Sequence, residues 1–320
     1  MAEGNFGIIC DEGCDLPAAF LERAGVVCAS LGEKNPGPTR ADGHAGASGT
    51  ADGSAVTVAD MAPVLEACYR ALAARGVTEV VSVHSAGCFS PAVEAARQAA
   101  AACADELRVE VVDSGSGSAA TGMLLDRASF YRSRGADLDA ATTALSELAS
   151  HVRLLVVPAT SAPLVRRRAR RAHAGLLSRA TASLRVRISG ERGLYLVTRG
   201  EVTQLARSTD LAELTGRLAH AMSAVAANEG PLTYVVVETG DSRSLRALEK
   251  PLDTNEFDAR RLGTVRAGVS VGEAVGAGAV AVALVPTIAY DRLPGDEGTA
   301  EDLVDVLAAA EAGVPEDATA

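Results

Sequence analysis

The sequence predicts an α/β protein of two domains, with a parallel sheet in the N-terminal domain and a mixed-sheet α+β arrangement in the C-terminal domain. Strand-like and helical patterns alternate as far as about residue 150, which indicates a parallel sheet covered by helices on both faces. After Val152, short strand-like runs separated by Gly190 and Gly200 indicate a meander. The first buried strand ends at an acidic, glycine-bearing turn, and α/β proteins bind ligands at such strand ends.

The N-terminal half contains four expected strands, at 6–10, 26–31, 77–84 and 108–112. Helical patterns run from Asp60 to Arg75, from Ser90-Pro91 onward, and from 139 to 151. Another helix follows the fourth strand and ends near Gly135. Asp15 is placed to cap a short helix after the first strand, and Pro17 suits its first turn. Residues 34–54 are rich in Gly, Ala, Asp and Ser, which predicts a long loop.

The C-terminal half is expected to hold strands at 154–157, 185–189, 193–198, 201–207, 232–238 and 256–262, with an apolar Ala/Val/Gly run at 271–285. Amphipathic patterns predict helices at 211–225 and 242–250. We therefore expect an N-terminal α/β domain at 1–150, a C-terminal mixed α/β domain at 151–290, and an acidic tail at 291–320 containing one helix at 302–311.

Composition narrows the class of protein. The 320 residues carry 41 acidic and 30 basic side chains, a net charge of -11, which argues against nucleic-acid binding. No apolar run is long enough to span a bilayer, and the start of the sequence lacks the apolar region of a signal peptide. The six cysteines form no C-x-x-C pair and are interpreted as reduced core residues. We expect a cytoplasmic protein with no cofactor and no metal.

Two expected helix starts carry a hydroxyl side chain. Thr57 stands just ahead of the helix that Asp60 is placed to cap, and Ser90 begins the helix after the strand at 77–84. Free N–H groups and the helix dipole favour a carboxylate or phosphate at such positions. The alternative is that both residues only cap or end local structure, as Ser and Thr commonly do.

Four motifs resemble those of the DegV family of bacterial fatty-acid-binding proteins. The segment Asp11-Glu-Gly-Cys-Asp-Leu-Pro17 is similar to the family's opening D-S-T-A-D-L-P. Phe89-Ser90 matches the L-S of its L-S-G-T loop, and Asp113-Ser114 matches its V/I-D-S. Gly276-Ala-Gly278-Ala279 resembles its G-P-G-A. The order and spacing of these motifs hold from about residue 6 to residue 285.

The resemblance implies two α/β domains with an apolar tunnel, lined by Ala, Val, Leu and Phe89, that holds an acyl chain. It also implies that the ligand's carboxylate is held by a Thr, a Ser, an Arg and a His. Thr57 and Ser90 fall on the first two, Arg168 of the 166–171 Arg cluster on the third, and Ala274 occupies the His position. The candidate ligand-binding residues are Thr57, Ser90, Arg168, Phe89, Cys88, Asp11 and Ser114.

The implied function is a carrier without catalytic groups, which presents the carboxylate of a fatty acid, or of a similar long apolar ligand with an anionic head, to a separate fatty-acid kinase. A diverged relative with another apolar ligand or a regulatory role is one alternative. A nucleotide-dependent enzyme is another, because the loop 113–120 contains a formal G-x-G-x-x-A pattern. Glu12 and Gly13 replace the family's first-turn Ser and Thr, and the carboxylate of Glu12 would repel an anionic ligand nearby.

Overall fold

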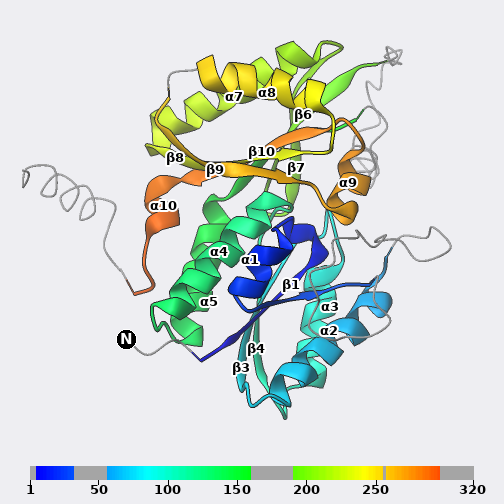
Figure 1. Ribbon diagram of the computed structural model, residues 1–320, viewed down its shortest axis with the longest axis vertical. Coiled ribbons are helices and arrows are strands. Elements are labelled where there is room, and N and C mark those ends of the chain that lie inside the picture. Colours follow the sequence, from blue (N-terminus) through cyan, green and yellow to red (C-terminus); the bar gives the residue numbers. More distant parts are fainter. Residues whose placement is uncertain (1–4, 32–55, 160–189, 255–256, 296–320) are drawn as a thin grey trace, which may run out of the picture.

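The fold contains two β-sheets with helices between and around them (Figure 1). The computed structural model describes residues 5–31, 56–159, 190–254 and 257–295. The first sheet has four parallel strands and the second has six strands of mixed direction. The predicted fold class is therefore confirmed. The proposed domain division near residue 150 stays a prediction, although the first sheet ends before it and the second begins after it.

The first sheet has the strand order β2-β1-β3-β4. Its strands are β1 (Gly7–Asp11), β2 (Val26–Ala29), β3 (Glu79–His84) and β4 (Arg108–Asp113). A 3-10 turn, η1 (Glu12–Cys14), and the short helix α1 (Ala18–Arg23) connect β1 to β2. Strand β1 is buried at every position, as expected for a parallel strand covered on both faces.

Helices cover both faces of this sheet. One face carries α2 (Val58–Ala73) and α3 (Ala92–Ala102), and the other carries α4 (Ala119–Ser133) and α5 (Leu138–His151). Neighbouring residues of β1 point to opposite faces: Ile9 packs with Leu65 of α2, whereas Ile8 packs in the core that contains Leu124 of α4. This alternation is the period-2 geometry of a strand.

The second sheet has the strand order β7-β6-β5-β10-β8-β9. Its strands are β5 (Arg153–Val157), β6 (Arg192–Thr198), β7 (Glu201–Ser208), β8 (Leu232–Glu238), β9 (Ala259–Arg266) and β10 (Val280–Pro286). Only the β8–β9 pair is parallel among the pairings described for this sheet. Helices α7 (Leu211–Glu229) and α8 (Ser242–Thr254) cover its outer face (Figure 1), while α9 (Val269–Val275) and α10 (Thr287–Asp291) flank β10.

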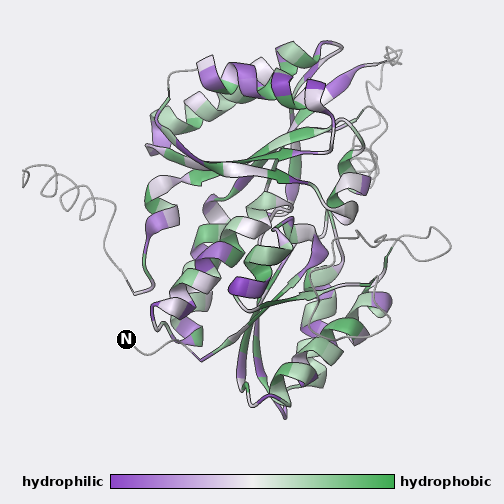
Figure 2. Cartoon of the chain, viewed as in Figure 1, coloured by the Kyte–Doolittle hydropathy of each residue, from purple (hydrophilic) through white to green (hydrophobic). Residues whose placement is uncertain are grey.

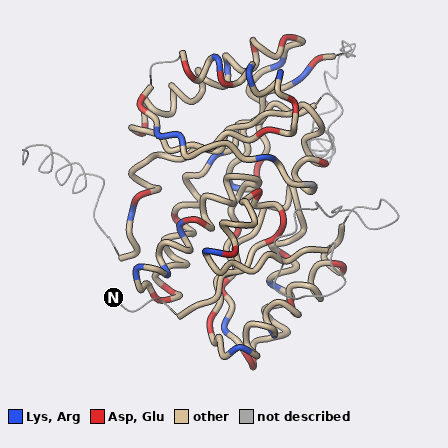
Figure 3. The backbone as a smooth tube through the Cα atoms, viewed as in Figure 1, with Lys and Arg blue, Asp and Glu red and all other residues tan. Residues whose placement is uncertain are grey.

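Helix α4 lies between the two sheets. Its Leu124 and Leu125 share one continuous core with Ile8 of the first sheet and with Val156 and Val237 of the second. Residues 114–125 are all buried, so the beginning of α4 leaves no face to solvent. Apolar residues dominate the inner strands of both sheets and this central layer (Figure 2), whereas α7 and α8 carry charged residues of both signs (Figure 3). Among the described helices, none combines the length and the apolar character needed to cross a membrane.

Several predicted element boundaries are corrected. The strand expected at 256–262 is β9, which begins and ends later, and the apolar run 271–285 is divided between α9 and β10. Gly276 and Gly278 separate these two elements with φ of 82° and 80°, in the left-handed region that favours glycine. The expected strand 185–189, loop 34–54, tail helix 302–311 and Arg cluster with Arg168 lie outside the described residues.

Two helix-interior glycines provide a paired test of this packing. A Cβ at Gly122 of α4 would lie 2.8 Å from the carbonyl oxygen of Cys14, whereas one at Gly216 of α7 would meet no atom within 4 Å. We expect G216A to raise the free energy of unfolding by about 0.5–1 kcal/mol, because alanine favours helix. We expect G122A to lower the free energy of unfolding by roughly 1–3 kcal/mol, because the added methyl group would displace the backbone of Cys14. Urea unfolding measures both, and equal effects would contradict the close approach of α4 to the η1 turn.

Candidate functional site

The carboxyl edge of the parallel sheet faces the second sheet, and three turns meet there. The amide of Ala86, after β3, donates to the Ser116 carbonyl at 2.7 Å. The amide of Ser118, after β4, donates to the Gly13 carbonyl of η1 at 2.7 Å. Because these hydrogen bonds join the turns after β1, β3 and β4, the edge forms one rigid platform.

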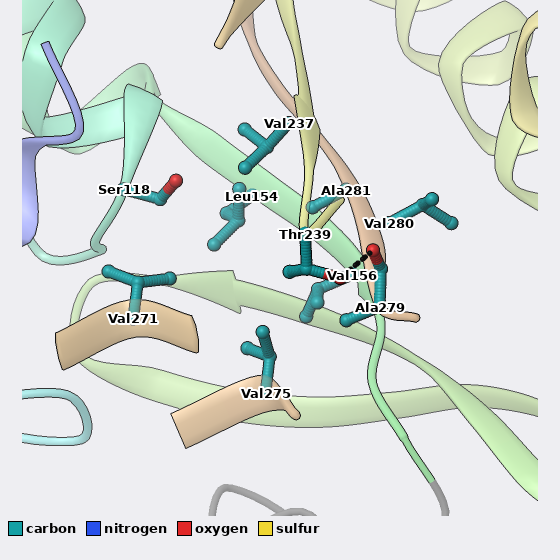
Figure 4. A pocket seen from close by; sticks show the side chains of 10 residues that line it. All are labelled: Ser118, Leu154, Val156, Val237, Thr239, Val271, Val275, Ala279, Val280 and Ala281. Carbon is teal, nitrogen blue, oxygen red and sulfur yellow. Dashed lines mark hydrogen bonds between the residues drawn. The ribbon is translucent and has the colours of Figure 1, made fainter. Parts of the chain in front are cut away.

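An apolar cavity lies between this platform and the second sheet (Figure 4). Its volume is about 10 Å³, roughly the space that one water molecule needs. The first sheet's side contributes Ser118, and the second sheet and α9 contribute Leu154, Val156, Val237, Thr239, Val271, Val275, Ala279, Val280 and Ala281. Small and branched apolar side chains therefore form almost the whole wall.

The two hydroxyl groups of the wall are both engaged as donors. Thr239 Oγ1 donates to the Ala279 carbonyl at 3.0 Å, as the dashed line in Figure 4 marks. Ser118 Oγ donates to Asp15 Oδ2 at 2.5 Å. With both protons directed to these acceptors, the cavity offers no hydroxyl proton to an anion, and its interior suits a hydrocarbon chain better than a carboxylate.

Asp15 has a different role from the one its sequence position predicts. Pro17, and not Asp15, is the N-cap residue of α1, and α1 has no side-chain cap. Asp15 instead adopts a left-handed conformation, with φ of 52°, after η1 and directs its carboxylate into the protein. There Oδ1 accepts a 2.7 Å hydrogen bond from the Gly268 amide, just before α9. Burial raises the pKa of Asp15 to about 7, and the hydrogen bonds from Ser118 and Gly268 only partly oppose this.

Asp11, the first candidate residue, belongs to a buried hydrogen-bonded chain. Its carboxylate accepts hydrogen bonds from the amides of Gly13 and Ser85 at 3.0 and 2.9 Å. Its Oδ1 also lies 3.1 Å from Nδ1 of His84, and Nε2 of His84 lies 2.7 Å from Ser82 Oγ. Burial alone would raise the pKa of Asp11, but the hydrogen bond and charge of His84, with the two amides, lower it below the ordinary value.

This series of hydrogen bonds has the Asp–His–Ser order of a hydrolase triad, but its serine is not accessible to a substrate. Ser82 and His84 are fully buried, and Ser82 Oγ accepts a 2.8 Å hydrogen bond from the hydroxyl of Tyr69 in α2. A nucleophile must reach its substrate, and this serine cannot. The chain therefore ties α2 to β1 and β3 and holds the platform in place.

Ser90 lies against the first turn of α2, and a joint site formed by its hydroxyl and that of Thr57 stays a prediction. The hydroxyl of Ser90 lies 3.7 Å from the sulfur of Met61, one turn after Thr57, and it accepts a 3.2 Å hydrogen bond from the Ala92 amide. Since a thioether is a weak acceptor, the proton of Ser90 can be redirected to a ligand at little cost. Neither Thr57 nor Ser90 is part of the cavity wall described above.

Thr57 is the exposed N-cap residue of α2, and Asp60 is the third helical residue instead of the cap that was predicted. The two side chains form a capping box, in which Thr57 Oγ1 donates to Asp60 Oδ2 at 2.6 Å. The Asp60 carboxylate therefore holds the proton that Thr57 would offer to an anionic ligand.

Phe89, Cys88 and Ser114 are buried around the glycine-containing loop 114–118. A Cβ at Gly117 would lie 2.5 Å from the Phe89 ring, and one at Gly115 would lie 2.9 Å from Cα of Arg199 in the β6–β7 turn. Ser114 Oγ donates to the Ser116 carbonyl at 3.1 Å. Close packing explains these glycines, and the covered loop leaves no space for the pyrophosphate of a nucleotide.

The remaining motif positions differ in what they offer. Ala274, at the predicted His position, lies in α9, is 9% exposed and supplies no hydrogen-bond donor. Glu12 accepts a hydrogen bond from the Ser30 hydroxyl. A Cβ at Gly13 would lie 2.5 Å from Ser85 Oγ, so this turn has no space for a side chain.

Three of the six cysteines gather at the end of β1. Cys10 and Cys28 are register partners on neighbouring strands, and the sulfurs of Cys10 and Cys14 lie 3.9 Å apart. All six thiols are free. The hydrogen bonds from Cys10 and Cys28 lower the pKa of Cys14. In the part of the chain that the structure describes, no group of three or more His, Cys, Asp and Glu side chains has an arrangement that could hold a metal ion.

Sequence reasoning missed the second half's contribution to the cavity. The signal was present in β5, where Leu154 and Val156 alternate with Leu155 and Val157: the first pair faces the central core and the second pair faces α7. Alternation alone shows that both faces of a strand are covered. It does not show that one face adjoins free space, because that depends on how closely α9 approaches.

The fold and site define an α/β protein with an apolar cavity between a parallel and a mixed sheet. Residues 5–287 match the family model described as "Uncharacterised protein, DegV family". This chain therefore belongs to the DegV family. No curated protein matches it.

Solved structures with the same fold have low sequence identity to this chain. A DegV family protein from Thermus thermophilus, described by its fatty-acid binding, is 18% identical with a TM-score of 0.66, over 88% of this chain and 99% of that chain. DegV from Bacillus subtilis, described as a fatty acid binding protein, is 14% identical with a TM-score of 0.67, over 88% and 99%. A stearic-acid-binding protein from Eubacterium ventriosum is 16% identical with a TM-score of 0.66, over 89% and 99%.

The buried carboxylate of Asp11 generates a pH-dependent stability test. Because its folded-state pKa lies below the ordinary value of about 3.9, Asp11 contributes stability above about pH 4 and loses it as pH falls through the folded-state pKa. We expect D11N to lower the free energy of unfolding by about 1–3 kcal/mol at pH 7. The difference from the wild type should narrow toward acid pH.

Urea unfolding between pH 7 and pH 2.5 measures this difference. Asp137, the exposed N-cap residue of α5, provides the control, because Asn caps a helix as well as Asp does and D137N should change stability little. A D11N effect of the same size at both ends of the pH range would rule out the assigned role of the carboxylate.

Proposed function

We propose that this protein binds a long-chain fatty acid in the cytoplasm and presents the carboxylate to a separate kinase. The observation that carries the proposal is the apolar cavity between the sheets, whose two hydroxyl groups donate inward to Asp15 and Ala279. The fatty-acid binding printed for the Thermus thermophilus and Bacillus subtilis relatives supports it.

The acyl chain would supply most of the affinity. Each buried methylene contributes about 0.8 kcal/mol of transfer free energy, so a chain of some length outweighs any single polar contact. The cavity volume of about 10 Å³ is far below the roughly 300–1,000 Å³ of typical small-molecule pockets. Binding a long chain therefore requires the cavity wall to move outward.

The carboxylate would lie outside the cavity, near the start of α3. Ser90 is the better-placed donor, because its proton meets only the sulfur of Met61. Thr57 would first have to break its hydrogen bond to the Asp60 carboxylate. Arg168 remains a candidate from the resemblance alone.

An apolar ligand without an acid group is a second candidate. The Thr57 proton is held by Asp60, and Ala274 supplies no donor where the family has His. Both observations weaken a carboxylate site while leaving the apolar cavity unchanged.

Extraction of the purified full-length protein under denaturing conditions, followed by mass spectrometry, tests the proposal. A fatty acid in the extract would support it, a neutral lipid would favour the second candidate, and a nucleotide would point to the enzyme alternative.

We expect A281L, which adds carbon atoms inside the cavity, to weaken binding of a fluorescent long-chain fatty acid at least about tenfold, because the larger side chain fills the space of the acyl chain. A224L on the exposed face of α7 is the control, and equal loss in both variants would argue against the cavity.

Ser90 can be tested through chain length. We expect S90A to weaken binding by about 10–100-fold, the effect of one hydrogen bond to a charged group, and to impair phosphate transfer by a fatty-acid kinase. The dependence of log Kd on chain length should stay unchanged, because the tail contacts are intact. S133A, at the exposed end of α4, serves as the control. Wild-type transfer by S90A would remove Ser90 from the presentation site.

A further inference from the structure

Asp15 joins three elements that meet at the seam between the sheets. The residue ends η1 and is 8% exposed. Its two carboxylate oxygens accept hydrogen bonds from different elements: Ser118 Oγ at 2.5 Å, at the start of α4, and the Gly268 amide at 2.7 Å, at the start of α9. A Cβ at Gly268 would lie 2.9 Å from Asp15 Oδ1, so the contact depends on a glycine there.

Both partners of Asp15 belong to the cavity wall or adjoin it. Ser118 lines the cavity directly, and Val271 and Val275 line it from α9 (Figure 4). Gly268 immediately precedes α9, so the carboxyl group of Asp15 fixes the start of this helix relative to α4. Displacement of α9 would widen the cavity, as a long acyl chain requires.

We propose that Asp15 is a proton-linked positioning residue, whose protonated form holds α9 against the η1 turn and whose ionisation favours the displacement of α9 that admits and releases the ligand. The identity of the ligand rests on the proposed function, whereas the movement of α9 does not.

The cost of burying a carboxylate provides the driving force. Burial raises the pKa of Asp15 to about 7, so near neutral pH the carboxyl group changes between charged and uncharged forms. Displacement of α9 would hydrate the carboxylate and return its pKa toward about 3.9. The closed form therefore binds the proton more tightly, and its population falls as pH rises from about 4 to about 7 and levels off above that.

Other titratable groups lie on the elements that pack near Asp15. Its own segment carries Asp11, Glu12 and Cys14, and the charges of Cys14 and Asp11 add to the rise in the Asp15 pKa. Glu273 is the charged residue of α9, and the first turn of α4 has no acidic side chain. His84 contacts Asp11. A pH profile of the wild type alone would not separate these groups, so the test depends on substitution at Asp15.

The substitution D15N preserves shape and removes the titration. The amide oxygen can accept from Gly268 and the amide nitrogen can donate to Ser118, which imitates the protonated carboxyl group. Asn also tolerates the left-handed conformation of this position. The matched control is D113N, at the exposed end of β4, where the carboxylate accepts a hydrogen bond from the Gly115 amide.

Release of a fluorescent long-chain fatty acid is measured by stopped flow between pH 6 and pH 8. With pKa values of about 7 closed and about 3.9 open, linkage predicts release roughly tenfold faster at pH 8 than at pH 6 in the wild type and in D113N. In D15N the dependence should be lost and release should stay slow. The same tenfold dependence in D15N would overturn the proposal.

Hydrogen exchange provides a readout that needs no ligand. The amides of Gly272 and Gly276 donate within α9 and report its opening. The ratio of wild-type to D15N exchange rates at each pH cancels the intrinsic base catalysis, and we expect this ratio to rise about tenfold from pH 6 to pH 8. A rise without fatty-acid binding would support Asp15 and sink the proposed function. A constant ratio in a protein that binds fatty acid would overturn the role of Asp15 and support the proposed function.

S118A is the second variant, for use if D15N does not fold. The Ser118 hydrogen bond lowers the pKa of Asp15, so its removal should move the midpoint of the release and exchange profiles to higher pH. A midpoint that does not move would overturn the proposal.

Discussion

The packing of α4 between the two sheets is the constraint on which the rest of the structure depends. One helix supplies apolar contacts to Ile8 on one side and to Val237 on the other, so the sheets share a single core. The beginning of α4 meets the η1 turn so closely that Gly122 has no space for a side chain. Because α4 is fixed on both sides, Ser118 at its start has a fixed position, and α9 is the adjoining element that we propose to move.

Two buried aspartates, one in the platform and one beside the cavity, differ in charge state. Asp11 keeps its charge because amides and His84 surround it, and it stabilises the platform. Asp15 has fewer donors and a pKa near neutrality, and it lies where the first half meets α9. Two aspartates four residues apart thus have opposite pKa shifts, because hydrogen-bond donors outweigh burial at one and burial outweighs donors at the other.

The sequence predicts the strand–helix order because local periodicity records which side chains are buried. It also predicts that Thr57 and Ser90 stand at the starts of two helices, because a helical pattern follows each of them and Ser and Thr are common at such positions. It misassigns Asp15, because a residue before a proline-initiated helix is the expected cap, whereas tertiary contacts with Ser118 and Gly268 direct its carboxylate elsewhere. The cavity wall could not be predicted either, because Val156 and Val271 come from distant segments whose separation is set by packing.

The glycine-containing loop after β4 has a consequence for how such sequences are interpreted. Gly115 lies against the backbone of Arg199, and Gly117 lies under the Phe89 ring, so both glycines exist to let protein atoms approach. Their spacing nevertheless reproduces a dinucleotide-binding signature. Close packing between layers can therefore reproduce the glycine spacing of a cofactor motif, and in this chain that spacing marks the contact between layers instead of a nucleotide site.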